Sequence, residues 1–291
     1  MSGKQDIVEG VDAIVTETTE GEIITGAEKE VAKRFAQGSN DKYGRFFLAA
    51  LSAIPWVIPL SLIASLKGEM DQDGLNSSFR LWLQEHQEKL KEVVQTINEI
   101  LTRLDSFGAE VQQRIESPEY LNLVRRAFRT WDEADTQEKR LMLKQLLTNA
   151  GAITLCPDDQ VRLFIDWIER YHEAHFAVIK EVYLHQPITK GRIWDNLHSE
   201  GRPRDNTAQA GLFGYLTREL NMGGIIHLNR QTNAYGQTMR SPRQSSSGSN
   251  RSDTLESHFD DTKEWVLSEL GKEFVRYVMK DVDLQLQDAP N

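Results

Sequence analysis

The chain has 291 residues, of which 39% are hydrophobic and 27% are charged, and this composition excludes a wholly disordered protein. Its formal net charge of −10 argues against a protein that coats nucleic acid with its whole surface, so any nucleic-acid site must be a local basic patch. The single cysteine, Cys156, cannot form a disulfide within the chain, which favours a reducing compartment.

Residues 1–40 form an acidic N-terminal arm. Two weakly amphipathic stretches within it carry the apolar residues Ile7, Val8, Val11, Ile14 and Val15, then Ile23, Ile24, Ala27, Val31 and Phe35. Because acidic side chains accompany both stretches, we expect the arm to be mobile or packed on the rest of the chain rather than bound to anionic lipid. A cleaved secretory leader is not expected, since the first long apolar run begins only at Phe46.

The most apolar part of the chain is residues 46–66, where 21 consecutive residues carry no charge, and it lies within a predicted membrane segment and linker, residues 41–75. At 1.5 Å per residue, a helix of this length covers about 30 Å, the thickness of one bilayer core. The pattern predicts a membrane or pore segment; the alternative is a buried helix or hairpin in the core of a soluble protein. The predicted membrane residues are Phe46, Phe47, Leu51, Ile54, Pro55, Trp56, Ile58, Pro59 and Leu62.

The charges around this segment are difficult to combine with a simple single span. More Lys and Arg residues precede it (Lys33, Arg34, Lys42, Arg45) than follow it (Lys67, Arg80), which would keep the N-terminus inside. The disulfide-free C-terminal part would then lie outside. We therefore expect that the arm is exported, that the segment does not cross at rest, or that it inserts only on activation. Pro55 and Pro59 would kink or divide such a helix.

A helix over residues 76–117 has the clearest periodicity, and it opens a predicted coiled-coil and helical domain, residues 76–173. Apolar residues alternate four and three apart, as in a coiled-coil seam, and leucine at a with β-branched residues at d favours a homotetramer. The alternative is that this helix packs on the following helices of its own chain. The predicted oligomerisation residues are Phe79, Leu83, His86, Leu90, Val93, Ile97, Ile100, Leu104, Phe107 and Val111, with His86 as a register-setting polar residue.

Residues 119–185 carry three further amphipathic helices, which predict an ordinary helical core. His172 and His175 do not make a metal motif, because Phe176 stands where HExxH needs its second histidine. Cys156 precedes Pro157 at a helix start with no obvious histidine partner, so a nucleophile is not expected. We expect no metal and no cofactor.

Residues 174–282 follow a different pattern, with helices, a Gly-containing turn, a short β-branched strand, a long polar loop, a second strand and a last helix; residues 283–291 are a tail. The sequences PITKGRIWDNL, DNTAQAGLFGYLTREL, NMGG with IIHL, and WVLSELGKEFVRYVM resemble the second helix, recognition helix, turn with strand, and return strand with last helix of a winged helix. The predicted fold class is therefore mainly α, with a membrane segment and helical bundle followed by a winged-helix-like α+β domain.

This winged-helix-like sensor domain contains a basic loop, residues 229–252, with four arginines and no acidic residue. Arginines that meet phosphates beside rings that stack on bases are typical of single-strand binding. The alternatives are protein or small-nucleotide sensing and a purely structural module. The predicted nucleic-acid or nucleotide residues are Arg202, Arg204, Arg218, His227, Arg230, Tyr235, Arg240, Arg243 and Arg251.

No phosphate-binding glycine loop, nucleophile elbow or matched carboxylate pair is present in the sequence, so we expect a non-catalytic protein. Residues 46–66, 79–111 and 205–276 together resemble the architecture of bacterial antiphage (antiviral defence) membrane effectors, and more faintly the channel-type effector of the Hailong system. The resemblance implies a homotetrameric ion channel in the inner membrane, with most of the chain in the cytoplasm. An oligonucleotide made by a partner nucleotidyltransferase would gate it. The alternative is a soluble coiled-coil winged-helix DNA-binding regulator.

Overall fold

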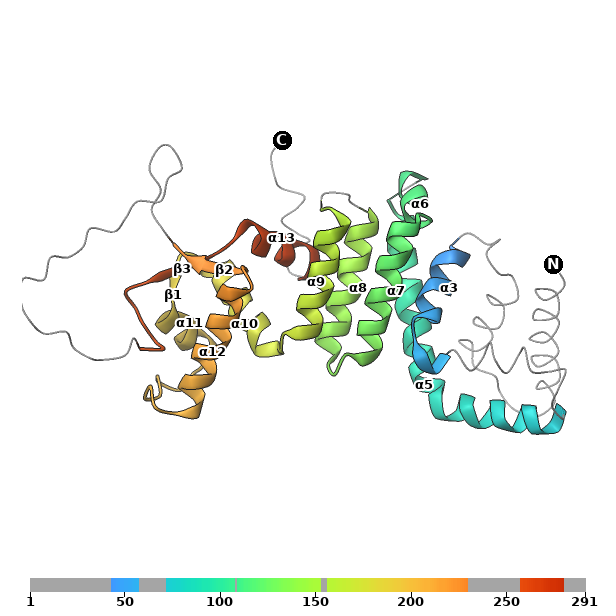
Figure 1. The fold of residues 1–291 in the computed structure, drawn as a ribbon, viewed down its shortest axis with the longest axis horizontal. Helices are drawn as coiled ribbons and strands as arrows, with labels where there is room; N and C mark the ends of the chain where they lie inside the picture. The colour runs from blue at the N-terminus through green and yellow to red at the C-terminus, as the bar shows by residue number, and fades with distance from the viewer. Residues whose placement is uncertain (1–42, 58–71, 108, 153–155, 230–256, 280–291) are drawn as a thin grey trace, which may run out of the picture. The chain divides into compact units, whose positions relative to one another are not determined.

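The structure is a computed structural model that describes residues 43–57, 72–107, 109–152, 156–229 and 257–279 (Figure 1). This part of the chain is mainly helical, with ten α-helices and one small antiparallel sheet. The chain divides into two compact units, Met1–Arg170 and Tyr171–Asn291, which we call the helical unit and the C-terminal unit. The coarse prediction of a mainly α protein is confirmed.

The described part of the helical unit is a bundle in which α8 is central. Helix α8 packs on α5, α7 and α9, and α3 packs on the other side of α7 (Figure 1). Its elements are α3 (Gly44–Ser52), a 3-10 turn η3 (Pro55–Val57), α5 (Gln72–Asp105), α6 (Ala109–Ile115), α7 (Pro118–Glu133), α8 (Gln137–Ala152) and α9 (Asp158–Arg170).

Helix α7 shows how local sequence fixes this bundle. The hydroxyl of Ser117 accepts a hydrogen bond from the backbone N–H of Tyr120, and Pro118 occupies the first turn, where its missing N–H is not needed. The buried phenol of Tyr120 donates to the backbone carbonyl of Leu147 in α8 at 2.8 Å. Burial raises the pKa of this phenol far above its ordinary value, which keeps it a neutral donor.

The described residues of the predicted membrane segment belong to the core of this bundle. Phe46, Phe47, Leu51 and Ile54 are buried, and the ring of Phe46 meets that of Phe128 in α7 edge-on at 6.5 Å. Residues 44–57 therefore agree with the alternative prediction for this segment, burial in the core of the chain. No helix in the described ranges is long and apolar enough to span a bilayer, and Ile58, Pro59 and Leu62 lie outside those ranges.

The end of α3 shows why this segment is not one long helix. Helix α3 stops at Ser52, and Pro55, which removes a backbone donor, begins the 3-10 turn. The indole N–H of Trp56 then donates to Asp132 at 2.6 Å, and its ring stacks on His86 at 5.1 Å. Trp56, predicted as a membrane residue, thus has specific contacts within the helical unit, whereas Pro55, also predicted as a membrane residue, is exposed.

The middle of the predicted seam is buried within the chain. Five of its residues are at most 1% exposed along the half of α5 that packs on α8: Leu90, Val93, Ile97, Ile100 and Leu104. Ion pairs from Glu92 to Arg140 and from Glu99 to Lys144 flank this contact. These five residues therefore pack within their own chain, which is the alternative that the sequence left open. Oligomerisation stays a prediction.

The prediction of one uninterrupted helix over residues 76–117 is wrong. Helix α5 ends at Asp105, and Val111 is a buried residue of the separate helix α6. Phe107 lies in the turn after α5 and is exposed. The next residue in the sequence is Gly108, a helix-stop signal that the four-three pattern concealed. Phe79 and Leu83 belong to α5, but their side chains lie outside the described part.

The C-terminal unit combines helices with a three-stranded antiparallel sheet in the order β1-β3-β2 (Figure 1). Strand β3 is central, with Trp265 opposite Ile188 of β1 on one side and Leu228 of β2 on the other. The elements are α10 (Glu173–His185), β1 (Ile188–Thr189), α11 (Lys190–Leu197), α12 (Ala208–Met222), β2 (Ile226–Leu228), β3 (Glu264–Leu267) and α13 (Glu269–Val278).

Most elements of this unit lie where the sequence predicts them, with the exception of β1. The sequence predicts a helix over all of PITKGRIWDNL, whereas Ile188 and Thr189 form a strand and Thr189 then caps α11 by accepting from the N–H of Arg192. A two-residue strand is too short to show alternation. Thr207 caps α12 in the same way, so that helix begins at Ala208 rather than at Asp205.

Candidate binding surface on helix α12

Helix α12 is held against the C-terminal unit by one face. Ala210, Phe213, Leu216 and Leu220 are buried on this inner face, together with Thr217. The helix ends at two glycines, and Gly224 has a φ of 74°, in the left-handed region that favours glycine. The chain can therefore turn sharply into β2 while α12 keeps a fixed orientation.

The outer face of α12 exposes large apolar side chains. Leu212, Tyr215 and Met222 are 56%, 52% and 80% exposed, and spacings of three and seven residues place them in one row along the helix. We call these three residues the α12 stripe. Apart from its chain neighbours and the backbone of its own helix, no described residue lies within 4 Å of the position that a Cβ of Gly211, on the same face, would take. This surface is not evident from the sequence, because Leu212-Phe213 and Tyr215-Leu216 are adjacent apolar pairs, which do not indicate which residue of each pair faces inward.

Few charges accompany the α12 stripe. Arg218 lies on its edge and is exposed, as is Arg204 in the loop before α12. The single acidic residue of α12 is Glu219, whose carboxylate meets the buried imidazole of His175 in α10 at 3.1 Å. The surface is therefore mainly apolar with a basic edge.

The His175–Glu219 pair fixes α12 on α10. The backbone N–H of His172 donates to Nδ1 of His175 at 3.2 Å, which leaves Nε2 to carry the proton toward Glu219. Burial lowers the pKa of His175 below its ordinary value, although the hydrogen bond to Glu219 acts in the opposite direction. The structure thus favours a neutral imidazole at this contact.

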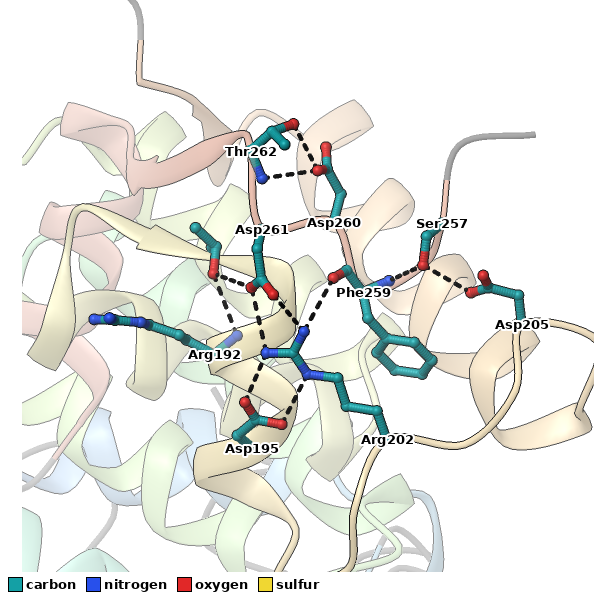
Figure 2. A network of polar contacts seen from close by, with 10 residues as sticks. Arg192, Asp195, Arg202, Asp205, Ser257, Phe259, Asp260, Asp261 and Thr262 are labelled. Atoms are coloured by element: carbon teal, nitrogen blue, oxygen red, sulfur yellow. Dashed lines mark hydrogen bonds and ion pairs between the residues drawn. The ribbon is translucent and has the colours of Figure 1, made fainter. Parts of the chain in front are cut away.

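A polar network joins the loop before α12 to the segment before β3 (Figure 2). The guanidinium of Arg202 donates to both carboxylate oxygens of Asp195 in α11, at 2.9 and 2.7 Å, and also pairs with Asp261. The hydroxyl of Thr189 donates to Asp261 at 2.8 Å. These hydrogen bonds hold the pKa values of Asp195 and Asp261 below their ordinary range and raise that of Arg202.

A second set of contacts fixes the same segment at the start of α12. The carboxylate of Asp205 accepts from the hydroxyl of Ser257 at 3.0 Å (Figure 2). It also accepts from the backbone N–H of His258 at 3.0 Å. Phe259 stacks on Phe213 of α12 at 5.7 Å and meets Trp194 of α11 edge-on at 5.1 Å. Residues 257–261, which follow the predicted basic loop, are therefore anchored beside the N-terminus of α12.

The predicted nucleic-acid residues have different positions. Arg202 lies in the polar network, which gives it a structural role as the bridge between Asp195 and Asp261. Arg204, Arg218 and His227 are exposed. The other predicted residues lie outside the described part: Arg230, Tyr235, Arg240, Arg243 and Arg251. Their binding role stays a prediction.

Comparison with known proteins adds no assignment to this surface. No protein-family model, curated protein or solved structure matches the chain. Within the described ranges, no group of three or more His, Cys, Asp or Glu residues could hold a metal ion. The geometry of α12 and its surroundings is therefore the basis for a functional conclusion.

Proposed function

We propose that the C-terminal unit is a winged-helix-type binding module and that it binds a protein through the α12 stripe. The order helix, short strand, helix, helix and two further strands supports this class, as does the sheet order β1-β3-β2. In such a module the second helix of the helix-turn-helix, here α12, presents its outer face to the partner.

The exposed side chains of α12 are the reason for proposing a protein as the partner. A helix that recognises base pairs presents Arg, Lys, Asn or Gln to the base edges. It also lies against the negatively charged phosphate backbone of the nucleic acid. The outer face of α12 instead presents Leu212, Tyr215 and Met222, each more than half exposed. Grouped apolar side chains with aromatic and methionine members at a basic rim are typical of a protein interface.

Site-specific photocrosslinking in cells tests this proposal. A benzoylphenylalanine at position 215, in the middle of the α12 stripe, should give adducts with another protein that resist nuclease and are cleaved by protease. The same group at position 192, an exposed residue of α11, is the control and should give none of these adducts. Adducts from position 215 that nuclease removes, or no protein adducts at all, would contradict the proposal.

Nucleic-acid binding is a second candidate, which one observation favours. The contacts of Asp205 with Ser257 and His258 hold one end of segment 230–256 at α12, and the N–H of Asn229 bonded to the carbonyl of Glu264 holds the other end on the sheet. The four arginines of the predicted basic loop therefore belong to a segment tethered on this unit.

Oligonucleotide binding at several salt concentrations tests the second candidate. Arg240→Ala with Arg243→Ala should weaken binding of a single-stranded oligonucleotide, and the wild-type affinity should fall by on the order of two decades between 50 and 300 mM salt if several phosphates are contacted. Gln237→Ala with Gln244→Ala is the matched control. Salt-independent binding would argue against phosphate contacts.

The gated membrane effector remains a separate proposal, which the resemblance of the whole architecture supports. Its test is independent of α12: the full chain is expressed, the cells are broken without detergent and membranes are pelleted. The proposal requires the chain in the pellet. Full recovery in the supernatant would remove it, and native mass of the purified chain would test the homotetramer.

A further inference from the structure

The imidazole of His175 is enclosed at the start of α10. His175 is fully buried, and the ring of Tyr171, which is buried as well, lies 4.9 Å from the imidazole ring. A Cβ at Gly223 would come within 2.3 Å of the Tyr171 hydroxyl, so the tyrosine packs directly against the end of α12. Water therefore has no access to the imidazole while Tyr171 keeps this position.

Both ring nitrogens of His175 have partners that suit the neutral imidazole. Nδ1 accepts a hydrogen bond from the backbone N–H of His172 at 3.2 Å, and Nε2 lies 3.1 Å from the carboxylate of Glu219. An imidazole with its one proton on Nε2 satisfies both contacts. A protonated imidazole carries a hydrogen on each nitrogen, so Nδ1 and the N–H of His172 would then be two donors that face each other.

We propose that His175 is an acid-sensitive switch, which releases the chain at residues 171–172 when the imidazole takes up a second proton. At an exposed site, water would accept the two hydrogen bonds that Nδ1–H and the His172 N–H can no longer make with each other. At the buried His175, both donors would stay unsatisfied, which is costly. Proton uptake is therefore coupled to a local opening of the chain that leads into α10.

The released residues follow the boundary between the two units. The helical unit ends at Arg170, and α10 begins at Glu173, so residues 171–172 are the whole connection between α9 and α10. Release would free this connection while the elements on either side keep their own packing. The switch acts on the chain itself and does not require a partner at the α12 stripe.

The charges around His175 determine when the switch acts and what stays attached. Burial lowers the pKa of His175 below its ordinary value, and a positive charge on the exposed His172, whose ring lies 6.0 Å away, acts in the same direction. The carboxylate of Glu219 favours the protonated form. Release is therefore expected below about pH 6.5, and the contact with Glu219, which then becomes an ion pair, should keep α12 on α10.

Hydrogen exchange of the His172 amide in the full chain tests this inference. The measured quantity is its protection factor, which corrects for the intrinsic effect of pH on exchange. We expect this factor to fall by up to about tenfold for each pH unit between about 6.5 and the lower pKa of folded His175, because the open form binds a proton that the closed form excludes. The amide of the buried Leu216 in α12 is the internal reference and should keep its protection.

Two variants separate His175 from its neighbour. In His175→Gln, the side-chain amide can accept from the N–H of His172 and donate to Glu219 without titrating, so the protection factor should no longer depend on pH. In His172→Asn, the backbone N–H is kept and the exposed imidazole is removed, so the dependence on pH should persist.

Three results would overturn the inference. The first is a His172 protection factor that does not change with pH in the wild type, a result that needs no substitution. The second is the same dependence on pH in His175→Gln, or its disappearance in His172→Asn. The third is an equal loss of protection at Leu216, which would show unfolding of the whole unit in place of a local release.

Discussion

Helices α5 and α12 both carry long apolar rows, but only the row on α5 is covered within the described part of the chain. On α5 the residues from Leu90 to Leu104 that form the row are at most 1% exposed, whereas the α12 stripe is 52% to 80% exposed. The difference shows that periodicity predicts that a helix face will be buried and does not predict by which molecule. Substitutions in the apolar row of α5 should therefore impair folding, whereas substitutions in the α12 stripe should impair partner binding and leave folding nearly unchanged.

The largest expected effect is on α5. Ile97→Asp with Ile100→Asp should unfold the helical unit, because two carboxylates would be buried against α8 without partners, at a cost above about 5 kcal/mol. Loss of the cooperative thermal transition in circular dichroism measures this. Glu92→Gln, which changes an ion pair at the edge of the same contact, is the control and should keep the transition. A folded double variant of lower oligomeric mass would instead favour the predicted intermolecular seam.

A smaller but still large effect is expected in α3. Phe46→Ala should lower the free energy of unfolding by about 3 kcal/mol or more, because it removes a fully buried ring that contacts Phe128. Urea unfolding without detergent checks this. Ser52→Ala, a change at the exposed end of the same helix, should cost little. Equal stability of the two variants would indicate that α3 is not part of a soluble core.

The His175–Glu219 contact should make stability depend on pH. Since the pKa of folded His175 lies below its ordinary value of about 6.5, the unfolded chain binds the proton first as the pH falls. The free energy of unfolding should therefore decrease as the pH drops from about 6.5 through the lower folded pKa, and should be unaffected by this group above that window. Urea unfolding at several pH values should show a steeper decrease for the wild type than for His175→Gln; parallel curves would contradict this assignment.

The smallest effect on folding is expected at the α12 stripe. Leu212→Ser with Tyr215→Ser should change the free energy of unfolding by less than about 0.5 kcal/mol, because both side chains are more than half exposed. Phe213→Ser with Leu216→Ser, on the buried face of the same helix, should cost several times more. Urea unfolding compares the two. A large loss for the stripe variant would mean that the stripe is part of the core.

The elements that the sequence predicts best are those with a strong local signal. Turn residues at Gly223 and Gly224 precede β2, so this turn and strand are recognisable without tertiary information. The prediction of α12 from Asp205 did not use the cap at Thr207, and the helix begins at Ala208. The break after Asp105 was hidden because Val111 continues the four-three spacing of α5. Residues 46–57 are apolar enough for either a bilayer or a core, and only the contacts of Phe46 and Trp56 distinguish the two.

The candidate site was harder to predict than the fold. Arginine at position 202 has the same sequence signal whether it meets a phosphate or bridges two aspartates, because Asp261, one of the two aspartates, is 59 residues away in the chain. The α12 stripe was difficult to predict for a different reason. Helix α12 carries apolar residues on both faces, so the sequence does not show which face is exposed. In both cases the missing information was which side of an element faces the rest of the unit.

The two anchors around segment 230–256 also have a practical consequence. The hydrogen bond from Asn229 to Glu264 anchors one end of the segment on the sheet. The hydrogen bonds of Asp205 with Ser257 and His258 anchor the other end at the start of α12. Neither anchor depends on the residues between them. Loop-closure entropy rises by only about 0.6 kcal/mol for each doubling of loop length. The segment is therefore a suitable position for inserting a fluorescent protein or an engineered protease site, which would report on ligands at α12 without interrupting the sheet.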